Sequence, residues 1–397
     1  MKHNIFRSLT GYQYVVIAIC FLCNMLDGMD VLIISYAAPA IAEAWRLSPE
    51  ELGVIFSSGL IGMSVGAVFL APFADKLGRK PMMLLAPLIM GISIFLTSYA
   101  HSINQLMLLR FISGIGIGIM MATTASITAE YSPKETRGFW VSFVVAGYPV
   151  GAVITGLVSF SIIDNYGWEH LFKIAGIASL IVLPIIAIYL KEPTIEKTTS
   201  EPNKIAVNSL FEKQYRLNTI LLWTALFLCF TTLYFLLNWI PKLASDAGLS
   251  AKLAIYSGTI FNFGAIVGIP IQGWLSTRFG LNKTVGNLLI ITSVFLATFG
   301  FFKESDLMIV NLFLIGFGIQ AGFVGLYAIA ASLYHARIRT TGVGWAVGLG
   351  RIGGIIGPVL GGVLVGFGFG MMESFIAFAL PVFIAGILTL RIKYELK

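Results

Sequence analysis

Twelve long apolar runs make up most of this 397-residue chain and leave it few ways to fold. A helix needs about 20 consecutive apolar residues to cross the hydrocarbon core of a bilayer, and each run has roughly that length. Backbone groups inside lipid must bond within the chain, so we expect each run to be an α-helix. The runs are residues 14–38, 52–74, 82–99, 104–129, 139–162, 168–190, 217–240, 253–276, 284–302, 307–333, 342–366 and 371–390. The sequence therefore predicts an all-α polytopic membrane protein with twelve transmembrane helices.

The composition excludes other classes of protein. Hydrophobic residues are 57% of the chain and charged residues only 11%, which is incompatible with a set of soluble domains. The net charge of +7 does not indicate nucleic-acid binding, because Lys and Arg occupy short gaps between the apolar runs and form no stripe. The three cysteines fall inside apolar runs and predict neither a disulfide framework nor a metal site. The first run is too long for a signal peptide, so we count it as a span.

Basic residues predict how these spans are oriented. With the N-terminus in the cytoplasm, the cytoplasmic segments hold 19 Lys and Arg residues and the outer segments hold 4. An excess of Lys and Arg marks cytoplasmic loops. We therefore expect a multi-pass protein whose two termini both lie in the cytoplasm.

The spans fall into two related halves. The polar stretch 191–216 has mixed charge and little hydrophobicity, which is typical of a linker. It separates an expected N-terminal six-helix bundle, residues 1–190, from a C-terminal one, residues 217–397. Similar residues also recur 202 positions apart, at helix ends or loops that correspond in the two halves. These pairs are Pro39 and Pro241, Lys76 and Arg278, Gly78 and Gly280, and Arg137 and Arg339. The pattern indicates a duplicated six-helix unit.

The loop after the second span carries a resemblance to a known family. Its sequence at 74–80, Ala-Asp-Lys-Leu-Gly-Arg-Lys, resembles the signature loop of the major facilitator superfamily, and 273–280 resembles a weaker second copy. Segments 27–30, 110–116, 130–138 and 339–358 are similar to the superfamily's aromatic acid:proton symporters. The chain departs from the pattern at Ala71 and Thr277 and has a short linker. The resemblance implies the major facilitator fold, a bacterial cytoplasmic (inner) membrane and proton-coupled transport of an aromatic acid.

Two aspartates in the first span are the predicted proton-coupling residues. Asp27 and Asp30 are three residues apart, so they lie about one turn from each other on one helix face. Charge inside a bilayer is costly and usually functional. Asp27, closer to mid-membrane, is the preferred proton carrier. The alternative is that one aspartate only neutralises Arg110 and holds spans 1 and 4 together, since the expected depths of Asp30 and Arg110 agree.

Two arginines are the predicted anchors for a substrate carboxylate. Arg110 could receive it when the aspartates are protonated, or could serve only as the partner of Asp30. Arg351 lies near the middle of the eleventh span, and the second half offers it no clearly internal acidic partner. Its forked guanidinium matches a carboxylate, although bonds to backbone carbonyls are an alternative. Weaker substrate-binding candidates, each equally compatible with a contact between helices, are Asn238, Asn262, Gln320, Tyr148, Tyr327 and Tyr234.

The resemblance also implies a group of gating residues at the predicted cytoplasmic ends of the spans. Their charges are expected to form and break contacts between the halves, whereas the alternative is that they only set the topology. These residues are Asp75, Gly78, Arg79, Glu130, Arg137, Arg337 and Arg339.

The expected function is transport without catalysis. The sequence has no Walker loop, no dinucleotide-binding motif and no set of catalytic side chains, so we expect no enzyme activity, cofactor or nucleic-acid partner. A gradient must then drive transport. The preferred interpretation is proton-coupled import of a small aromatic carboxylate by a monomer in the lipid bilayer. Alternatives are another cargo (nicotinate, a dicarboxylate, a sugar acid or a neutral metabolite), proton-driven efflux, and a transporter-like sensor.

Overall fold

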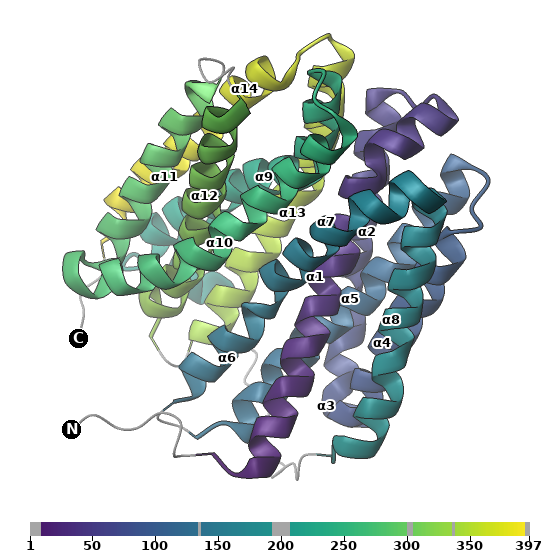
Figure 1. Ribbon diagram of the computed structural model, residues 1–397. Helices are drawn as coiled ribbons and strands as arrows, with labels where there is room; N and C mark the ends of the chain where they lie inside the picture. The colour runs from purple at the N-terminus through teal and green to yellow at the C-terminus, as the bar shows by residue number, and fades with distance from the viewer. Residues whose placement is uncertain (1–8, 134–135, 193–206, 300–304, 336–337, 394–397) are drawn as a thin grey trace. The chain divides into compact units, whose positions relative to one another are not determined.

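The computed structural model describes residues 9–133, 136–192, 207–299, 305–335 and 338–393. In these ranges the secondary structure is helical, without a β-strand (Figure 1). The chain forms two compact units. The first comprises Met1–Arg46 and Ser58–Lys197, and the second comprises Leu47–Ser57 and Thr198–Lys397.

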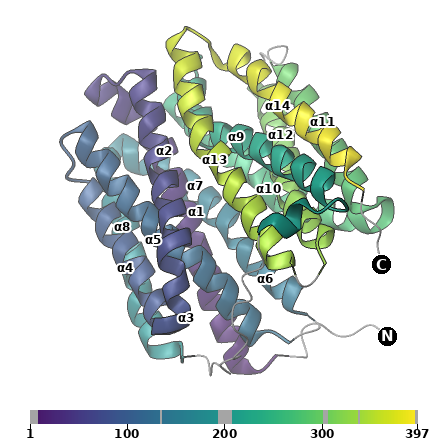
Figure 2. The ribbon, with the colours of Figure 1, turned by 180° about the vertical axis from the view of Figure 1, so that it is seen from behind.

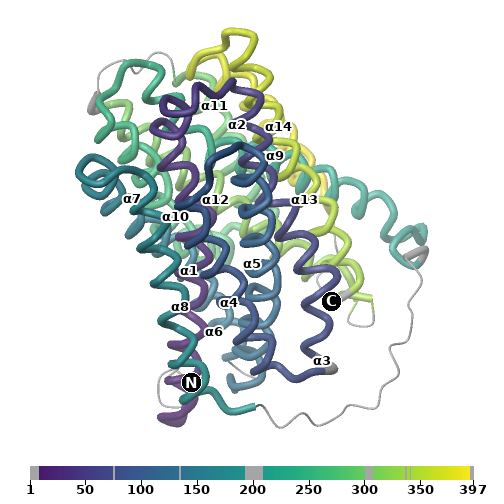
Figure 3. The backbone as a smooth tube through the Cα atoms, turned by 90° about the vertical axis from the view of Figure 1, so that its right-hand side faces the viewer, coloured from purple at the N-terminus to yellow at the C-terminus, as the bar shows by residue number. Residues whose placement is uncertain are grey.

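The first unit is built around α1, α4 and α5. α4 packs against both α5 and α8 (Figure 3), and α1 packs against α5 and α7. Its elements are α1 (Gly11–Trp45), most of α2 (Pro49–Val65), η2 (Gly66–Leu70), η3 (Ala71–Phe73), α3 (Ala74–Leu77), α4 (Arg79–Thr97), α5 (Ile103–Tyr131), α6 (Arg137–Val145), α7 (Gly147–Tyr166) and α8 (Trp168–Tyr189).

The second unit has α9 at its centre, packed against α13 and α14 (Figure 2). α10 packs against α12, and α11 packs against α14. The elements are η4 (Val207–Phe211), α9 (Arg216–Asp246), α10 (Ala251–Phe279), α11 (Leu281–Ala297), α12 (Ser305–Leu333), α13 (Arg339–Gly366) and α14 (Met371–Arg391). The first turns of α2 belong here as well, because the Ser57 hydroxyl donates to the Ile355 carbonyl at 2.6 Å.

The predicted all-α fold of twelve membrane-spanning helices is confirmed. Eleven helices of the described chain are long and apolar enough to cross a membrane, and the twelfth, α11, is an apolar helix of 17 residues. The last three residues of the predicted span 284–302 lie outside the described part of the chain.

Two predicted spans are less regular than expected. The run 52–74 changes from α-helix to a π-turn at η2 and a 3₁₀ turn at η3, where Pro72 lacks a backbone N–H. The run 139–162 is broken at Ala146 between α6 and α7. Pro149 cannot donate to the carbonyl of Val145, so the helical hydrogen-bond pattern fails at this point.

The expected duplication is visible in where corresponding helices begin. α5 and α12 begin at Ile103 and Ser305, and α6 and α13 begin at Arg137 and Arg339. Each pair is separated by the same 202 residues as the sequence repeats. Even a helix cap is repeated, because the hydroxyls of Ser48 and Ser250 each accept from the backbone N–H three residues later. The two units are therefore built to one plan.

Close helix contacts at glycine repeat as well. A Cβ atom on Gly62 of α2 would lie 2.0 Å from the Phe111 carbonyl oxygen, and one on Gly264 of α10 would lie 2.3 Å from that of Phe313. Both glycines and both phenylalanines are 202 residues apart. Since no real side chain tolerates such distances, glycine at these positions sets how closely the helices approach.

Candidate functional site

A buried ion pair joins α1 and α5 in the first unit. Nη1 of Arg110 donates to the carboxylate of Asp30, and Nη2 donates to the Asp30 backbone oxygen at 2.8 Å. The two side chains are 4% and 0% exposed. The pair predicted from the expected depths is confirmed. Its energetic weight is large, because removing one partner of a buried pair typically costs about 3–5 kcal/mol.

Asp27 lies one turn before Asp30 on α1 and has a different environment. Its side chain is completely buried. Among the residues that the structure describes, none donates a hydrogen bond to either of its carboxylate oxygens. An ionised carboxylate without donors is far more costly to bury than a neutral acid. Asp27 therefore differs from Asp30, whose carboxylate is paired with a guanidinium.

Gly28, between the two aspartates, lies so close to the backbone of α7 that no larger residue fits there. A Cβ atom at this position would lie 1.9 Å from the carbonyl oxygen of Tyr148. The glycine thus lets α7 press against α1 next to Asp27. The side chain of Tyr148, a predicted substrate-binding residue, is half-buried at this contact.

In the second unit, four aromatic residues of α9 and α12 form an aromatic cluster. Phe230 is its centre, with ring centroids 4.8 Å from Phe323, 5.8 Å from Tyr234 and 6.3 Å from Tyr327. Phe323 and Tyr327 meet edge to face at 5.0 Å. Three of the four residues, all except Phe230, are partly exposed, so the cluster retains ring surface for another contact.

Arg351 of α13 lies beside this aromatic cluster. The neighbouring glycines hold α13 close to it, since a Cβ on Gly350 would lie 2.6 Å from the Phe230 ring and one on Gly354 would lie 3.0 Å from the Tyr234 ring. The arrangement offers a cation for an anionic group and aromatic faces for a ring.

The predicted polar candidates of the second unit mostly bond within the helices. The Asn238 amide donates to the Tyr234 carbonyl at 2.7 Å, which places it one turn from the aromatic cluster. The Asn262 amide donates to the Gly258 carbonyl at 2.9 Å, and the Gln320 amide donates to the Asn262 side-chain oxygen at 3.5 Å. Asn262 and Gln320 thus join α10 to α12, which agrees with a contact between helices.

The gating residues are described in part. Nη2 of Arg79 and Oε1 of Glu130 are 2.7 Å apart, a pairing that the sequence did not predict. Arg137 and Arg339 are exposed, and Nε of Arg339 donates to the Tyr334 carbonyl at 3.4 Å. The structure places Asp75 in α3 without describing its side chain, and Arg337 lies outside the described residues.

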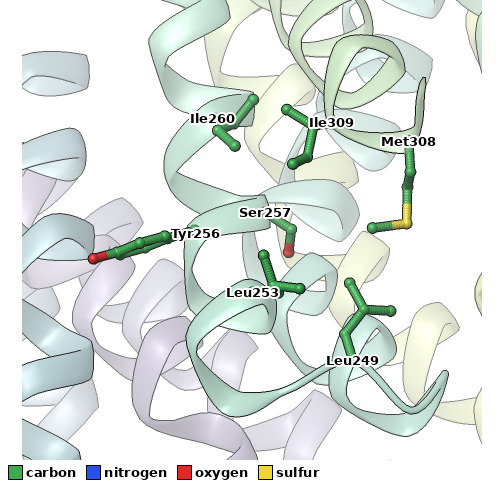
Figure 4. Close-up of a pocket in the computed structure, with 7 residues that line it drawn as sticks. All are labelled: Leu249, Leu253, Tyr256, Ser257, Ile260, Met308 and Ile309. Carbon is green, nitrogen blue, oxygen red and sulfur yellow. The ribbon is translucent and has the colours of Figure 1, made fainter. Parts of the chain in front are cut away.

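A small pocket lies between the start of α10 and the start of α12 (Figure 4). Its lining includes no charged side chain, and the Ser257 hydroxyl is already used by a bond to the Ala254 carbonyl at 2.6 Å. It therefore cannot neutralise a carboxylate. The lining residues are Leu249, Leu253, Tyr256, Ser257, Ile260, Met308 and Ile309.

Comparisons with known proteins agree with these features. The profile of the Major Facilitator Superfamily matches residues 20–269 and 222–396. The chain belongs to the major facilitator superfamily. It is 30% identical to the 4-hydroxybenzoate transporter PcaK of Pseudomonas putida and 29% identical to a gallate transporter of the same species. Each alignment covers 96% of this chain and 92% of the relative, which places the chain in the superfamily's aromatic acid transporter family.

Solved structures support the same fold. A D-xylose–proton symporter superposes with a TM-score of 0.79 at 17% identity, covering 97% of this chain and 99% of the symporter. This major facilitator protein is therefore a multi-pass secondary transporter of a small molecule and not an enzyme, as the sequence predicted.

The signature loop of this transporter is held by a residue that the sequence did not reveal. Glu192, just after α8, accepts the backbone N–H groups of Arg79 at 2.5 Å and Lys80 at 2.9 Å, and so caps α4. Gly78 has φ of +103°, and a Cβ there would lie 2.9 Å from the Glu192 carboxylate. The sequence of the linker does not indicate this contact, because the contact joins residues more than 110 positions apart in the chain.

Proposed function

We propose that this transporter imports a small aromatic carboxylate together with protons by alternating access. The observation that carries the proposal is Arg351 beside the aromatic cluster of Phe230, Tyr234, Phe323 and Tyr327. Relatives named as transporters of gallate and of 4-hydroxybenzoate support the same class of substrate.

The second unit would bind both ends of such a substrate. The guanidinium of Arg351 can donate two parallel hydrogen bonds to a carboxylate, which fixes the substrate's orientation. An aromatic ring gains about 0.5–1.5 kcal/mol from each stacked or edge-to-face contact beyond its buried area. Asn238 and Tyr327 would add hydrogen bonds around the substrate, and Asn262 and Gln320 would support the helices behind it.

The first unit would supply the coupling. Asp27 receives the proton, because it is buried without a donor and is more easily held as a neutral acid. Protonation of Asp30 would release Arg110, whose charge could then attract the incoming carboxylate. Import of a monocarboxylate with two protons moves one net positive charge, which the membrane potential favours by about 2.3 kcal/mol per 100 mV.

The topology and the gate complete the proposal. The excess of Lys and Arg in the proposed cytoplasmic segments supports a topology with both termini in the cytoplasm. In the proposal the protein is a monomer in a bacterial membrane, and the linker 191–216 joins bundle 1–190 to bundle 217–397 on the cytoplasmic side. The Arg79–Glu130 pair would then lie at the cytoplasmic side. Contacts at that side would form and break during the transport cycle. The residues assigned to this gate are Asp75, Gly78, Arg79, Glu130, Arg137, Arg337 and Arg339.

Substrate selectivity tests the proposed site. Benzoate and cyclohexanecarboxylate share a carboxylate on a six-membered ring, but only benzoate is aromatic. In proteoliposomes we expect wild type to prefer benzoate, Phe230→Leu to reduce that preference roughly fivefold, and Arg351→Gln to abolish uptake of both. Phe383→Leu, an exposed position on α14, is the matched control and should keep the preference. Unchanged selectivity in Phe230→Leu, or uptake retained in Arg351→Gln, would contradict the site.

A further inference from the structure

A stripe of hydroxyl side chains runs along the second half of α5 to its C-cap, Ser132. Thr124, Thr128 and Ser132 follow one another at four-residue intervals and are at most 5% exposed. Each hydroxyl donates to the carbonyl four residues earlier, at 2.9, 2.7 and 2.6 Å respectively. Because a hydroxyl has one proton and two lone pairs, each of these oxygens can still accept a hydrogen bond.

The stripe faces polar groups of α1. The Asn24 amide donates to the Thr124 hydroxyl oxygen and to the Cys20 carbonyl, both at 3.1 Å. We call Cys20, Asn24, Thr124, Thr128 and Ser132 the hydroxyl seam. It begins one helical turn from Asp27 and ends beside Glu130, at the end of α5 that forms the pair with Arg79.

The second bundle shows that helix packing does not require a polar seam. The residues 202 positions after Cys20, Asn24, Thr124 and Thr128 are Leu222, Leu226, Leu326 and Ala330. All four are completely buried in the same helix pair of the second unit, α9 and α12. The position equivalent to Asp27 is Cys229. At these four positions the interface is polar only in the bundle that contains the aspartate, whereas the counterpart of Ser132 is Tyr334, whose hydroxyl donates to that of Thr219 at 3.2 Å.

We infer that the hydroxyl seam conducts the proton between Asp27 and the Glu130 end of α5. The inference rests on the proposed proton symport. Hydroxyls four residues apart on a helix are separated by about 6 Å along its axis. One water molecule bonded to both hydroxyls spans a similar distance, since two O–H···O bonds of about 2.8 Å add up to it. The seam thus has the spacing to hold a file of single water molecules during transport.

Proton transfer along this file is balanced. The O–H bond of protonated Asp27 breaks as its proton binds the first water. Each seam hydroxyl between two waters accepts a proton from one water and gives its own proton, released from the helix carbonyl, to the next. One proton leaves at the end of α5, Asp27 becomes a carboxylate, and each intermediate water and hydroxyl again holds its full number of protons. Of the ionisable groups around Asp27, Asp30 is bonded to Arg110, and the buried Cys23 lies one helical turn before Asp27 on α1.

The test replaces the seam with the residues of the second bundle. The variant Thr124→Leu/Thr128→Ala has side chains that the repeated fold already accommodates, and Thr124→Ser/Thr128→Ser retains the hydroxyls. The matched control is Thr155→Val/Ser159→Ala on α7, where two buried hydroxyls with the same spacing donate to their own helix at 2.8 and 2.6 Å. Proteoliposomes report net uptake driven by a proton gradient and, separately, counterflow of labelled benzoate, which needs no net proton release.

We expect the Leu/Ala variant to lose net uptake by roughly tenfold or more while counterflow stays within about twofold. The Ser/Ser variant and the α7 control should keep both activities. Normal net uptake in the Leu/Ala variant would contradict proton conduction through the hydroxyl seam, and so would an equal loss of net uptake and counterflow. If wild-type uptake ignores a protonophore, the proposed symport itself fails, and the seam fails with it.

Discussion

Asp27 and Asp30 illustrate how one helical turn changes what a carboxylate can do. Asp30 accepts from the guanidinium of Arg110, so its charge is compensated and holds α1 against α5. Asp27 is equally buried, but the described residues give its carboxylate no donor. Asp30 is therefore suited to holding the two helices together and to controlling when Arg110 is free, and Asp27 is suited to binding and releasing a proton.

The ion pair makes a prediction about stability. Arg110→Leu leaves the Asp30 carboxylate buried without its partner, so we expect it to lower the free energy of unfolding by about 3–5 kcal/mol. The double variant Arg110→Leu/Asp30→Leu removes both charges and should recover most of that loss. Thermal unfolding in detergent measures both effects. A double variant no more stable than Arg110→Leu would show that the pair itself is not the source of the cost.

At the scale of helices, glycine decides how closely neighbours pack. In α10, a Cβ on Gly268 would lie 2.4 Å from the Phe317 carbonyl oxygen, whereas one on Gly273 would have nothing within 4 Å. The two glycines belong to one helix and differ only in what they face.

This pair of glycines gives a controlled prediction. Gly268→Ala should destabilise the protein by about 1–3 kcal/mol, because α10 and α12 must move apart to admit the methyl group. Gly273→Ala should be neutral or slightly stabilising, since alanine favours a helix by up to about 1 kcal/mol over glycine. Melting temperatures of the two variants provide the measurement. Equal shifts would mean that the α10–α12 contact at Gly268 does not limit packing.

Sequence alone predicted the helices better than their irregularities and long-range contacts. Apolar length locates a span, and the expected depths of Asp30 and Arg110 were compatible with the pair that they form. The break at Ala146 depends on the missing N–H of Pro149, which hydrophobicity does not report. The Glu192 cap on α4 and the Arg79–Glu130 pair depend on how separate elements meet in the fold. Hydrophobic periodicity does not specify such contacts.

At the scale of the whole molecule, duplication explains which features are structural and which are functional. The helix starts, the serine caps and the glycine contacts recur 202 residues apart, so they serve the shared fold. Asp27, Asp30 and Arg110 correspond to Cys229, Thr232 and Leu312, and so occur in one copy only. Arg351 replaces the equivalent Pro149 in the other copy. In the proposed function, the first bundle holds the coupling residues and the second holds the substrate-binding residues.

The central claim is that a proton gradient drives uptake of an aromatic carboxylate through Asp27. The most direct measurement is accumulation of labelled benzoate and 4-hydroxybenzoate in proteoliposomes with an inward proton gradient, with wild type compared with Asp27→Asn. We predict accumulation in wild type that collapses on addition of a protonophore, and no accumulation in Asp27→Asn, which should still catalyse counterflow. Uphill accumulation by Asp27→Asn, or wild-type accumulation that a protonophore leaves unchanged, would contradict the account.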